Sequence, residues 1–109
     1  MWDVELSDEV TDWYLGLPTR DQAFADRAFD RLAELGPSIG MPHSKLLGDG
    51  LRELRFTCEN VARRVTYYID VERKVITLTT FRKQRNSERR EVQRAHRAMD
   101  DDRAGKGMR

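Results

Sequence analysis

Residues 51–83 read LRELRFTCENVARRVTYYIDVERKVITLTTFRK, and this stretch decides the fold. Apolar and polar side chains alternate through three segments of it, which predicts three strands, because successive side chains of a strand point to opposite faces. The polar segments TCEN and DVERK separate the three and predict short turns. Strands joined by short turns pair antiparallel, so we expect an antiparallel meander.

The same alternation gives each predicted strand a core face and an outward face. The expected core set is Leu54 and Phe56, then Val65, Tyr67 and Ile69, then Ile76 and Leu78. The expected outward set is Arg55, Arg64, Tyr68, Val75, Thr77, Thr79 and Phe81, with Lys83 at the exit. Two arginines are therefore predicted side by side on neighbouring strands.

Two helices are predicted before this sheet, after a short strand at residues 2–6. The first has Ser7 as its N-cap and ends before Pro18. The second starts at a capping box formed by Thr19 and Gln22 and stops at Gly36. So short a connection predicts an antiparallel helical hairpin, which would cover the apolar face of the sheet. Residues 36–50 are rich in glycine and proline and are expected to form a loop.

A basic segment, residues 82–85, follows the sheet and leads into a predicted last helix. Asn86 or Ser87 can cap this helix, whose thin apolar stripe contains Val92, Ala95 and Met99. Residues 100–109 lack core-forming side chains and are expected to be a flexible tail. The chain of 109 residues is therefore expected to form a single α+β domain, residues 1–109.

The net charge of +1 conceals a charge asymmetry along the chain. Residues 1–44 hold three Lys or Arg against nine Asp or Glu, whereas residues 45–109 hold seventeen against ten. A basic half favours a polyanionic partner, because phosphates are attracted over long range. A solvated charged surface with no such partner is the alternative, and the charge counts leave both open.

The cysteine content and the hydropathy of the sequence favour a reducing compartment and a protein that does not enter a membrane. The single cysteine, Cys58, cannot form an internal disulfide. The sequence has no apolar run near the roughly 20 residues that a membrane span needs, and its acidic start lacks the apolar core of a signal peptide. We therefore expect a cytoplasmic protein with no membrane partner.

The predicted pair of arginines suggests a phosphate site. Guanidinium groups bind phosphate oxygens with two parallel hydrogen bonds and stabilise the charge that develops during phosphoryl transfer. With Lys83 nearby, Arg55 and Arg64 would form a converging cationic site, and Tyr68 and Phe81 would offer rings for unpaired bases. The alternative is that the arginines pair with Glu53 on a solvated face, and the residues alone do not choose between the two.

The order and spacing of three segments resemble those of the HigB/RelE-like toxins of bacterial type II toxin–antitoxin systems, in particular the phage-derived group. The segments are GDGLRELRF (48–56), RRVTYYID (63–70) and TTFRKQRNSERREVQRAHRAMDD (79–101). The resemblance implies a RelE-like α+β fold, with two N-terminal helices on a mostly antiparallel sheet. It implies a ribosome-dependent mRNA endonuclease, in which the substrate's own 2′-OH attacks the adjacent phosphate without a metal or other cofactor.

Carried over position by position, the resemblance assigns catalytic roles to Arg55, Arg64 and Lys83. The residues expected to contact RNA are Lys45, His43, Tyr68, Phe81, Arg82 and Arg85. Arg52 stands where the family often has an aromatic residue, and Gln84 where a second lysine is common. The family has no universal catalytic histidine, so neither His43 nor His96 is assigned that role, and the group that transfers the proton stays unidentified.

The resemblance also implies partners. These are the ribosome with its mRNA and a cognate antitoxin, expected to be a small helix-turn-helix protein through which alone operator DNA would be bound. Two other interpretations stay open: a non-catalytic RNA- or ribosome-binding module of the same fold, and a protein that acts only inside a complex with a DNA-binding repressor.

Overall fold

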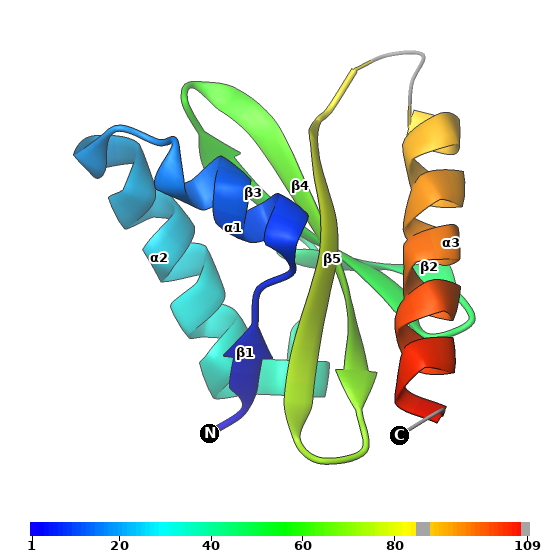
Figure 1. Ribbon diagram of the computed structural model, residues 1–109. Coiled ribbons are helices and arrows are strands. Elements are labelled where there is room, and N and C mark those ends of the chain that lie inside the picture. The colour runs from blue at the N-terminus through cyan, green and yellow to red at the C-terminus, as the bar shows by residue number, and fades with distance from the viewer. Residues whose placement is uncertain (85–87, 108–109) are drawn as a thin grey trace.

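The computed structural model of the chain describes residues 1–84 and 88–107, which form one five-stranded sheet with helices on both sides (Figure 1). The strands lie in the order β1–β5–β4–β3–β2; β1 runs parallel to β5, and the other neighbouring pairs are antiparallel. The elements in chain order are β1 (Asp3–Glu5), α1 (Asp8–Leu15), α2 (Thr19–Leu35), the 3-10 turn η1 (Gly36–Ser38), β2 (Ser44–Gly48), β3 (Leu51–Cys58), β4 (Val61–Asp70), β5 (Lys74–Arg82) and α3 (Glu88–Gly107). This arrangement confirms the predicted α+β class, with two N-terminal helices on a mostly antiparallel sheet.

Helices α1 and α2 cover one face of the sheet, as predicted. Their apolar stripes bury Val10, Ala28 and Leu32 against Leu54 and Val65 of the strands. The Ser7 hydroxyl accepts a hydrogen bond from the Val10 amide, which confirms the predicted cap of α1. The capping box predicted for α2 is wrong.

In the structure the N-cap of α2 is Pro18, and no side-chain bond caps the helix. Thr19 already lies within α2, and the Pro18 carbonyl accepts hydrogen bonds from the amides of Asp21 and Gln22. Pro18 itself has extended backbone, with φ −58° and ψ 152°, and proline is tolerated at this end of a helix because no amide donor is needed there.

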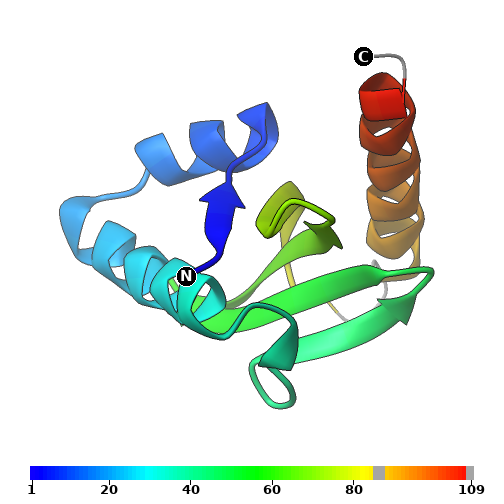
Figure 2. The same ribbon diagram turned by 90° about the horizontal axis from the view of Figure 1, so that it is seen from below.

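Helix α3 packs on the other side of the sheet from α1 and α2 (Figure 2). Ala95 and Met99 are fully buried against an apolar cluster formed by Leu51, Tyr68, Ile76 and Leu78. The expected caps at Asn86 or Ser87 lie outside the described residues. No helix within residues 1–84 and 88–107 is long and apolar enough to cross a membrane.

The stretch from residue 100 onwards, expected to be a flexible tail, continues α3 as far as Gly107. Polar contacts rather than apolar ones hold this end of the helix. Lys106 Nζ lies 3.1 Å from Asp70 Oδ2 and 3.2 Å from Asp102 Oδ2, and it donates to the Tyr68 hydroxyl at 3.0 Å. A sequence search for regularly spaced apolar residues does not detect such polar contacts.

A β-bulge in β5 overturns the face assignment predicted for that strand. Val65 pairs with Thr80 but Tyr67 pairs with Thr77, so β5 has one extra residue at this point. The Thr66 hydroxyl accepts from the Thr79 amide at 3.0 Å and stabilises the irregularity. Because side chains alternate along a strand, the extra residue exchanges the two faces on either side of it.

As a result, Ile76 and Leu78 pack under α3 with Tyr68, whereas Val75 joins the core under α1 and α2. The prediction had these three residues on the opposite faces. Phe81 lies beyond the bulge and pairs with Arg64, so it stays on the face predicted for it.

The sequence predicts a loop at residues 36–50, whereas in the structure residues 44–48 of this segment form strand β2. Ser44, Lys45 and Leu46 pair with Leu54, Glu53 and Arg52 of β3. The buried Ser44 hydroxyl lies 2.6 Å from the Tyr67 hydroxyl and fixes the strand to the core. Lys45 thereby becomes the cross-strand neighbour of Glu53.

The anchor at the end of α3 predicts a pH-dependent contribution to stability. The hydrogen bond from Lys106 lowers the pKa of Asp70 below its value in the unfolded chain. The pair therefore stabilises the fold above that unfolded pKa, and the contribution is lost as the pH falls through the folded pKa. We expect Lys106→Met to lower the free energy of unfolding by about 1 kcal/mol at pH 7 and by less at pH 3, as measured by urea denaturation. A deficit that stays the same at both pH values would contradict this origin.

Candidate functional site

The register between β3 and β4 places two arginines directly opposite each other. Arg55 and Arg64 are Cα partners, so their side chains leave the sheet on the same face. Side chains alternate regularly between the two faces along both strands up to this pair, and the predicted proximity of Arg55 and Arg64 is confirmed. Like charges directly opposite each other repel, so the pair requires a counter-charge.

Glu53 supplies that counter-charge. Its Oε1 atom lies 3.3 Å from Arg55 Nε and 3.4 Å from Arg64 Nε, although only the Arg55 contact has hydrogen-bond geometry. The Glu53 side chain is 1% exposed. Burial raises the pKa of this carboxyl, while the guanidinium groups of Arg64 and Arg55 and the ammonium of Lys45 lower it. Among Glu53, Arg55 and Arg64, one carboxylate shared between two guanidinium groups leaves one positive charge without a partner.

The two arginines differ in how much of each is exposed. Arg64 is 6% exposed and its Nη1 donates to the Arg63 carbonyl at 3.1 Å, so the side chain is held in one position. This contradicts the expectation that Arg64 is exposed. Burial lowers the pKa of Arg64, but a guanidinium still carries its charge at neutral pH. The Arg55 side chain is 19% exposed and can make further contacts.

Lys45 and Lys83 extend the cationic surface on either side of the arginine pair. Lys45 is exposed on β2, next to Glu53. The Lys83 amide donates to the Ala62 carbonyl at 2.9 Å and continues the β4–β5 ladder, so by alternation Lys83 shares a face with Arg64. Arg82 pairs with Arg63 and lies on the opposite face by the same rule. Arg85 lies outside the described residues.

Neither predicted stacking ring is open to a base. Tyr68 is 2% exposed and Phe81 is 7% exposed. Helix α3 covers Tyr68, whose hydroxyl donates to Asp102 while the Arg103 guanidinium lies 4.8 Å from the ring centroid. The prediction of two exposed rings is therefore wrong, and for Tyr68 the reason is that α3 docks on this face of the sheet.

His43 lies just before β2, beside Arg55, and its side chain contacts α2. Its carbonyl accepts from the Arg55 amide at 2.8 Å, and its Nδ1 lies 3.2 Å from Arg31 Nη1. His96 lies elsewhere again, with Nε2 3.3 Å from the Leu47 carbonyl.

Two carboxylates belong to the site: the sequence indicated Glu53 only as an alternative partner of the arginines on a solvated face, and it did not indicate Glu88. Glu53 precedes Arg55 by two positions, and this spacing alone places both on one face. Glu88, at the start of α3, lies close enough to raise the pKa of Glu53 and to oppose the lowering at Arg64. The approach of Glu88 depends on how α3 docks, so no local pattern could reveal it.

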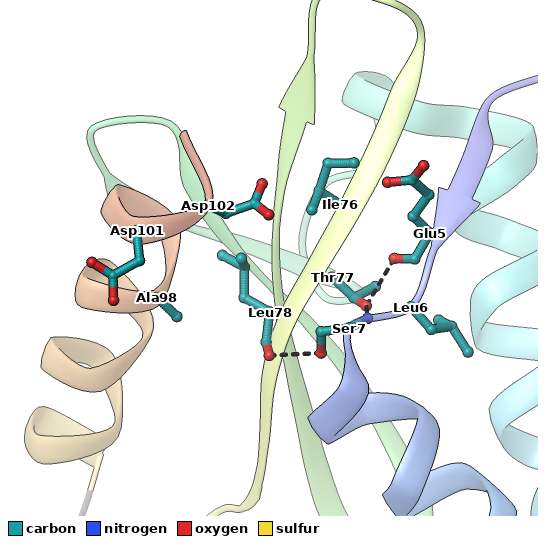
Figure 3. Close-up of a pocket in the computed structure, with 9 residues that line it drawn as sticks. All are labelled: Glu5, Leu6, Ser7, Ile76, Thr77, Leu78, Ala98, Asp101 and Asp102. Carbon is teal, nitrogen blue, oxygen red and sulfur yellow. Dashed lines mark hydrogen bonds between the residues drawn. The ribbon is translucent and has the colours of Figure 1, made fainter. Parts of the chain in front are cut away.

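A separate cavity of about 530 Å³ lies between the start of α1, strand β5 and the end of α3 (Figure 3). Ile76 and Leu78 contribute apolar surface, and Glu5, Asp101 and Asp102 contribute carboxylates. Because these carboxylates repel phosphate, we do not expect this cavity to hold RNA. In the part of the chain that the structure describes, no three His, Cys, Asp or Glu side chains group together as a metal site would need.

Comparisons with known proteins place this geometry in context. A family model described as "Phage derived protein Gp49-like (DUF891)" matches residues 12–100. A mutant of the E. coli toxin RelE in the free state superposes with a TM-score of 0.60 at 15% identity, over 92% of this chain and 96% of that one. The toxin–antitoxin complex RelBE2 from Mycobacterium tuberculosis contains a chain with a TM-score of 0.55 at 22% identity, over 75% of this chain and 98% of that one. No curated protein matches the sequence.

The role of Glu53 can be tested through stability. We expect Glu53→Ala to lower the free energy of unfolding by about 3 kcal/mol, because it leaves the buried guanidinium of Arg64 and the partly buried guanidinium of Arg55 without their shared counter-charge. Urea denaturation followed by circular dichroism measures this. Glu34→Ala, at an exposed position of α2, is the matched control and should change stability by less than about 0.5 kcal/mol. Equal losses in the two variants would rule out the shared counter-charge.

Proposed function

Since this chain belongs to the Gp49-like family of phage-derived proteins, and its fold is that of RelE toxins, we propose that it is the toxin of a type II toxin–antitoxin system. In this proposal it acts in the cytoplasm as a ribosome-dependent mRNA endonuclease and inhibits translation. The observation that carries the proposal is the pair of guanidinium groups, Arg55 and Arg64, fixed over one buried carboxylate.

The proposed reaction is attack by a 2′-OH of the mRNA on its adjacent phosphate. The new bond from the 2′ oxygen to phosphorus forms as the bond to the 5′ oxygen breaks, which leaves a cyclic phosphate and a free 5′-OH. Negative charge accumulates on the phosphate oxygens, where Arg55 and the accessible edge of Arg64 stabilise it. No metal takes part in this proposal.

Two protons must move in this reaction: one leaves the 2′-OH and one reaches the 5′ oxygen. Lys83 and Lys45 are the exposed lysines beside the arginine pair, and we assign one of them to proton transfer or to further charge stabilisation. Glu53 is too buried to touch RNA, so we assign it to positioning both guanidinium groups.

An antitoxin is the second part of the proposal. A toxin–antitoxin complex is among the similar structures, which supports a protein partner for this fold. We propose a small helix-turn-helix antitoxin encoded beside this chain, through which alone the complex would bind operator DNA. An adjacent gene of another type would argue against this choice of partner.

A non-catalytic RNA- or ribosome-binding module is the competing function. The observation that favours it is the burial of Arg64 and its pairing with Glu53, which suits a structural ion pair as well as a catalytic group. Tight, salt-dependent ribosome binding without cleavage would support this alternative.

Expression of the chain in a growing bacterium, with mapping of transcript 5′ ends, tests the proposal. We expect growth arrest and cuts in phase with codons, and we expect Arg55→Ala to abolish both, since an oxyanion contact contributes about 100-fold or more in rate. Normal growth with unchanged 5′ ends would reject the enzyme.

Folding controls accompany this experiment. Because Arg64 is buried, Arg64→Lys is preferable to alanine: it keeps the charge and removes the planar fork. Arg97→Ala removes a cation from the exposed side of α3 and should remain fully toxic. Circular dichroism must show that each variant is folded, and a folded, fully toxic Arg55→Ala would exclude Arg55 from catalysis.

A further inference from the structure

A second cationic hollow adjoins the arginine pair, between α2 and the end of β3. We call it the α2–β3 pocket. Its volume is about 420 Å³, in the range of small-ligand sites. Among the residues that line it are Phe24, Arg27, Arg31, His43, Arg55 and Phe56. Arg55 belongs both to this pocket and to the arginine pair, so the two sites are continuous.

The charge of this pocket is uncompensated on the α2 side. Arg27 and Arg31 form no ion pair with any carboxylate in residues 1–84 and 88–107. The residues that line the pocket include no acidic side chain. Two guanidinium groups that face a hollow without a counter-ion form a receptor for an anion.

His43 adds a hydrogen-bond donor. A guanidinium can only donate, so Nδ1 of His43 must accept the bond from Arg31 Nη1 at 3.2 Å. The tautomer that fits this contact has its ring proton on Nε2. Because no bond from Nε2 occurs within the described residues, this N–H is free to donate to a phosphate oxygen.

Phe24 adds an accessible aromatic ring. It is 42% exposed, unlike Tyr68 and Phe81, and the Arg27 guanidinium lies 4.8 Å from its centroid. A ring backed by a cation is a surface on which any nucleobase can stack. The combination of an anion receptor and a stacking ring favours a nucleotide over an acidic peptide, which has no base to stack.

We propose that the α2–β3 pocket binds a nucleotide of single-stranded RNA next to the one held at Arg55 and Arg64. Arg27, Arg31 and Nε2 of His43 hold the phosphate, and Phe24 stacks on the base. The strand thus continues from the sheet face past His43 onto α2. This inference rests on the proposed function for the identity of the RNA as substrate, and it adds a binding site outside the reacting centre.

RNA affinity tests the pocket separately from cleavage. The full-length chain is titrated into a fluorescein-labelled single-stranded RNA of mixed sequence, and anisotropy is measured from 50 to 200 mM salt. We expect the double variant Arg27→Gln/Arg31→Gln to weaken binding at least tenfold and to reduce the slope of log affinity against log salt by about 1.4, since each phosphate contact on a single strand contributes about 0.7. Phe24→Ala should weaken binding without changing the slope.

Arg20→Gln is the matched control, because Arg20 is an exposed arginine of the same helix that does not line the pocket. It should bind RNA within about twofold of the unmodified chain. Loss of affinity in the control equal to that of the double variant would overturn the pocket, as would an unchanged affinity in the double variant. Circular dichroism on each variant excludes unfolding as the cause.

The outcomes separate the pocket from the proposed reaction. If the chain cuts no RNA but the double variant binds RNA more weakly and with a smaller salt slope, the pocket stands and the enzyme fails. If the chain cuts mRNA and the double variant binds RNA as the unmodified chain does, the enzyme stands and the pocket fails. Unchanged RNA affinity with weakened antitoxin binding would assign the pocket to an acidic protein segment and would also overturn the proposal.

Discussion

One carboxylate shared by two guanidinium groups is the constraint on which this structure depends. The β3–β4 register brings Arg55 and Arg64 together, and Glu53 makes that register tolerable by lying between their Nε atoms. The same contact orients both guanidinium groups. Stability and the candidate chemistry therefore rest on one arrangement, and a change at Glu53 affects both.

The helices decide which parts of the sheet are available. Helices α1 and α2 bury one face completely enough to form the main core. On the other face α3 covers Tyr68, Ile76 and Leu78 but leaves Lys45, Arg55 and Lys83 at least partly accessible. The accessible cations continue around the edge of β3 to Arg27 and Arg31 on α2. Acidic groups gather instead in the cavity between α1 and the end of α3.

Within the acidic N-terminal half of the chain, the acidic and basic side chains of α2 lie on different parts of the surface. In α2 the acidic positions Asp26, Asp30 and Glu34 are exposed but do not line the α2–β3 pocket, whereas Arg27 and Arg31 do. The spacing of four residues puts both arginines on one side of the helix. The N-terminal half of the chain thus contributes a cationic surface although its net charge is negative. Net charge by segment is a poor guide to where a polyanion binds.

The sequence by itself determined the two N-terminal helices, the three strands within residues 51–83, the α+β class and the proximity of Arg55 to Arg64, because alternation and short turns are local properties. It also indicated the cap at Ser7 and the stop at Gly36. Only the tertiary structure decided the strand at residues 44–48, the exchange of faces at the bulge in β5, the burial of Tyr68 and Phe81 and the length of α3. Each of these depends on contacts between distant residues, such as Ser44 with Tyr67 and Lys106 with Asp70. The α2–β3 pocket depends on the same kind of contact, because the local periodicity of a sequence does not show which elements pack together.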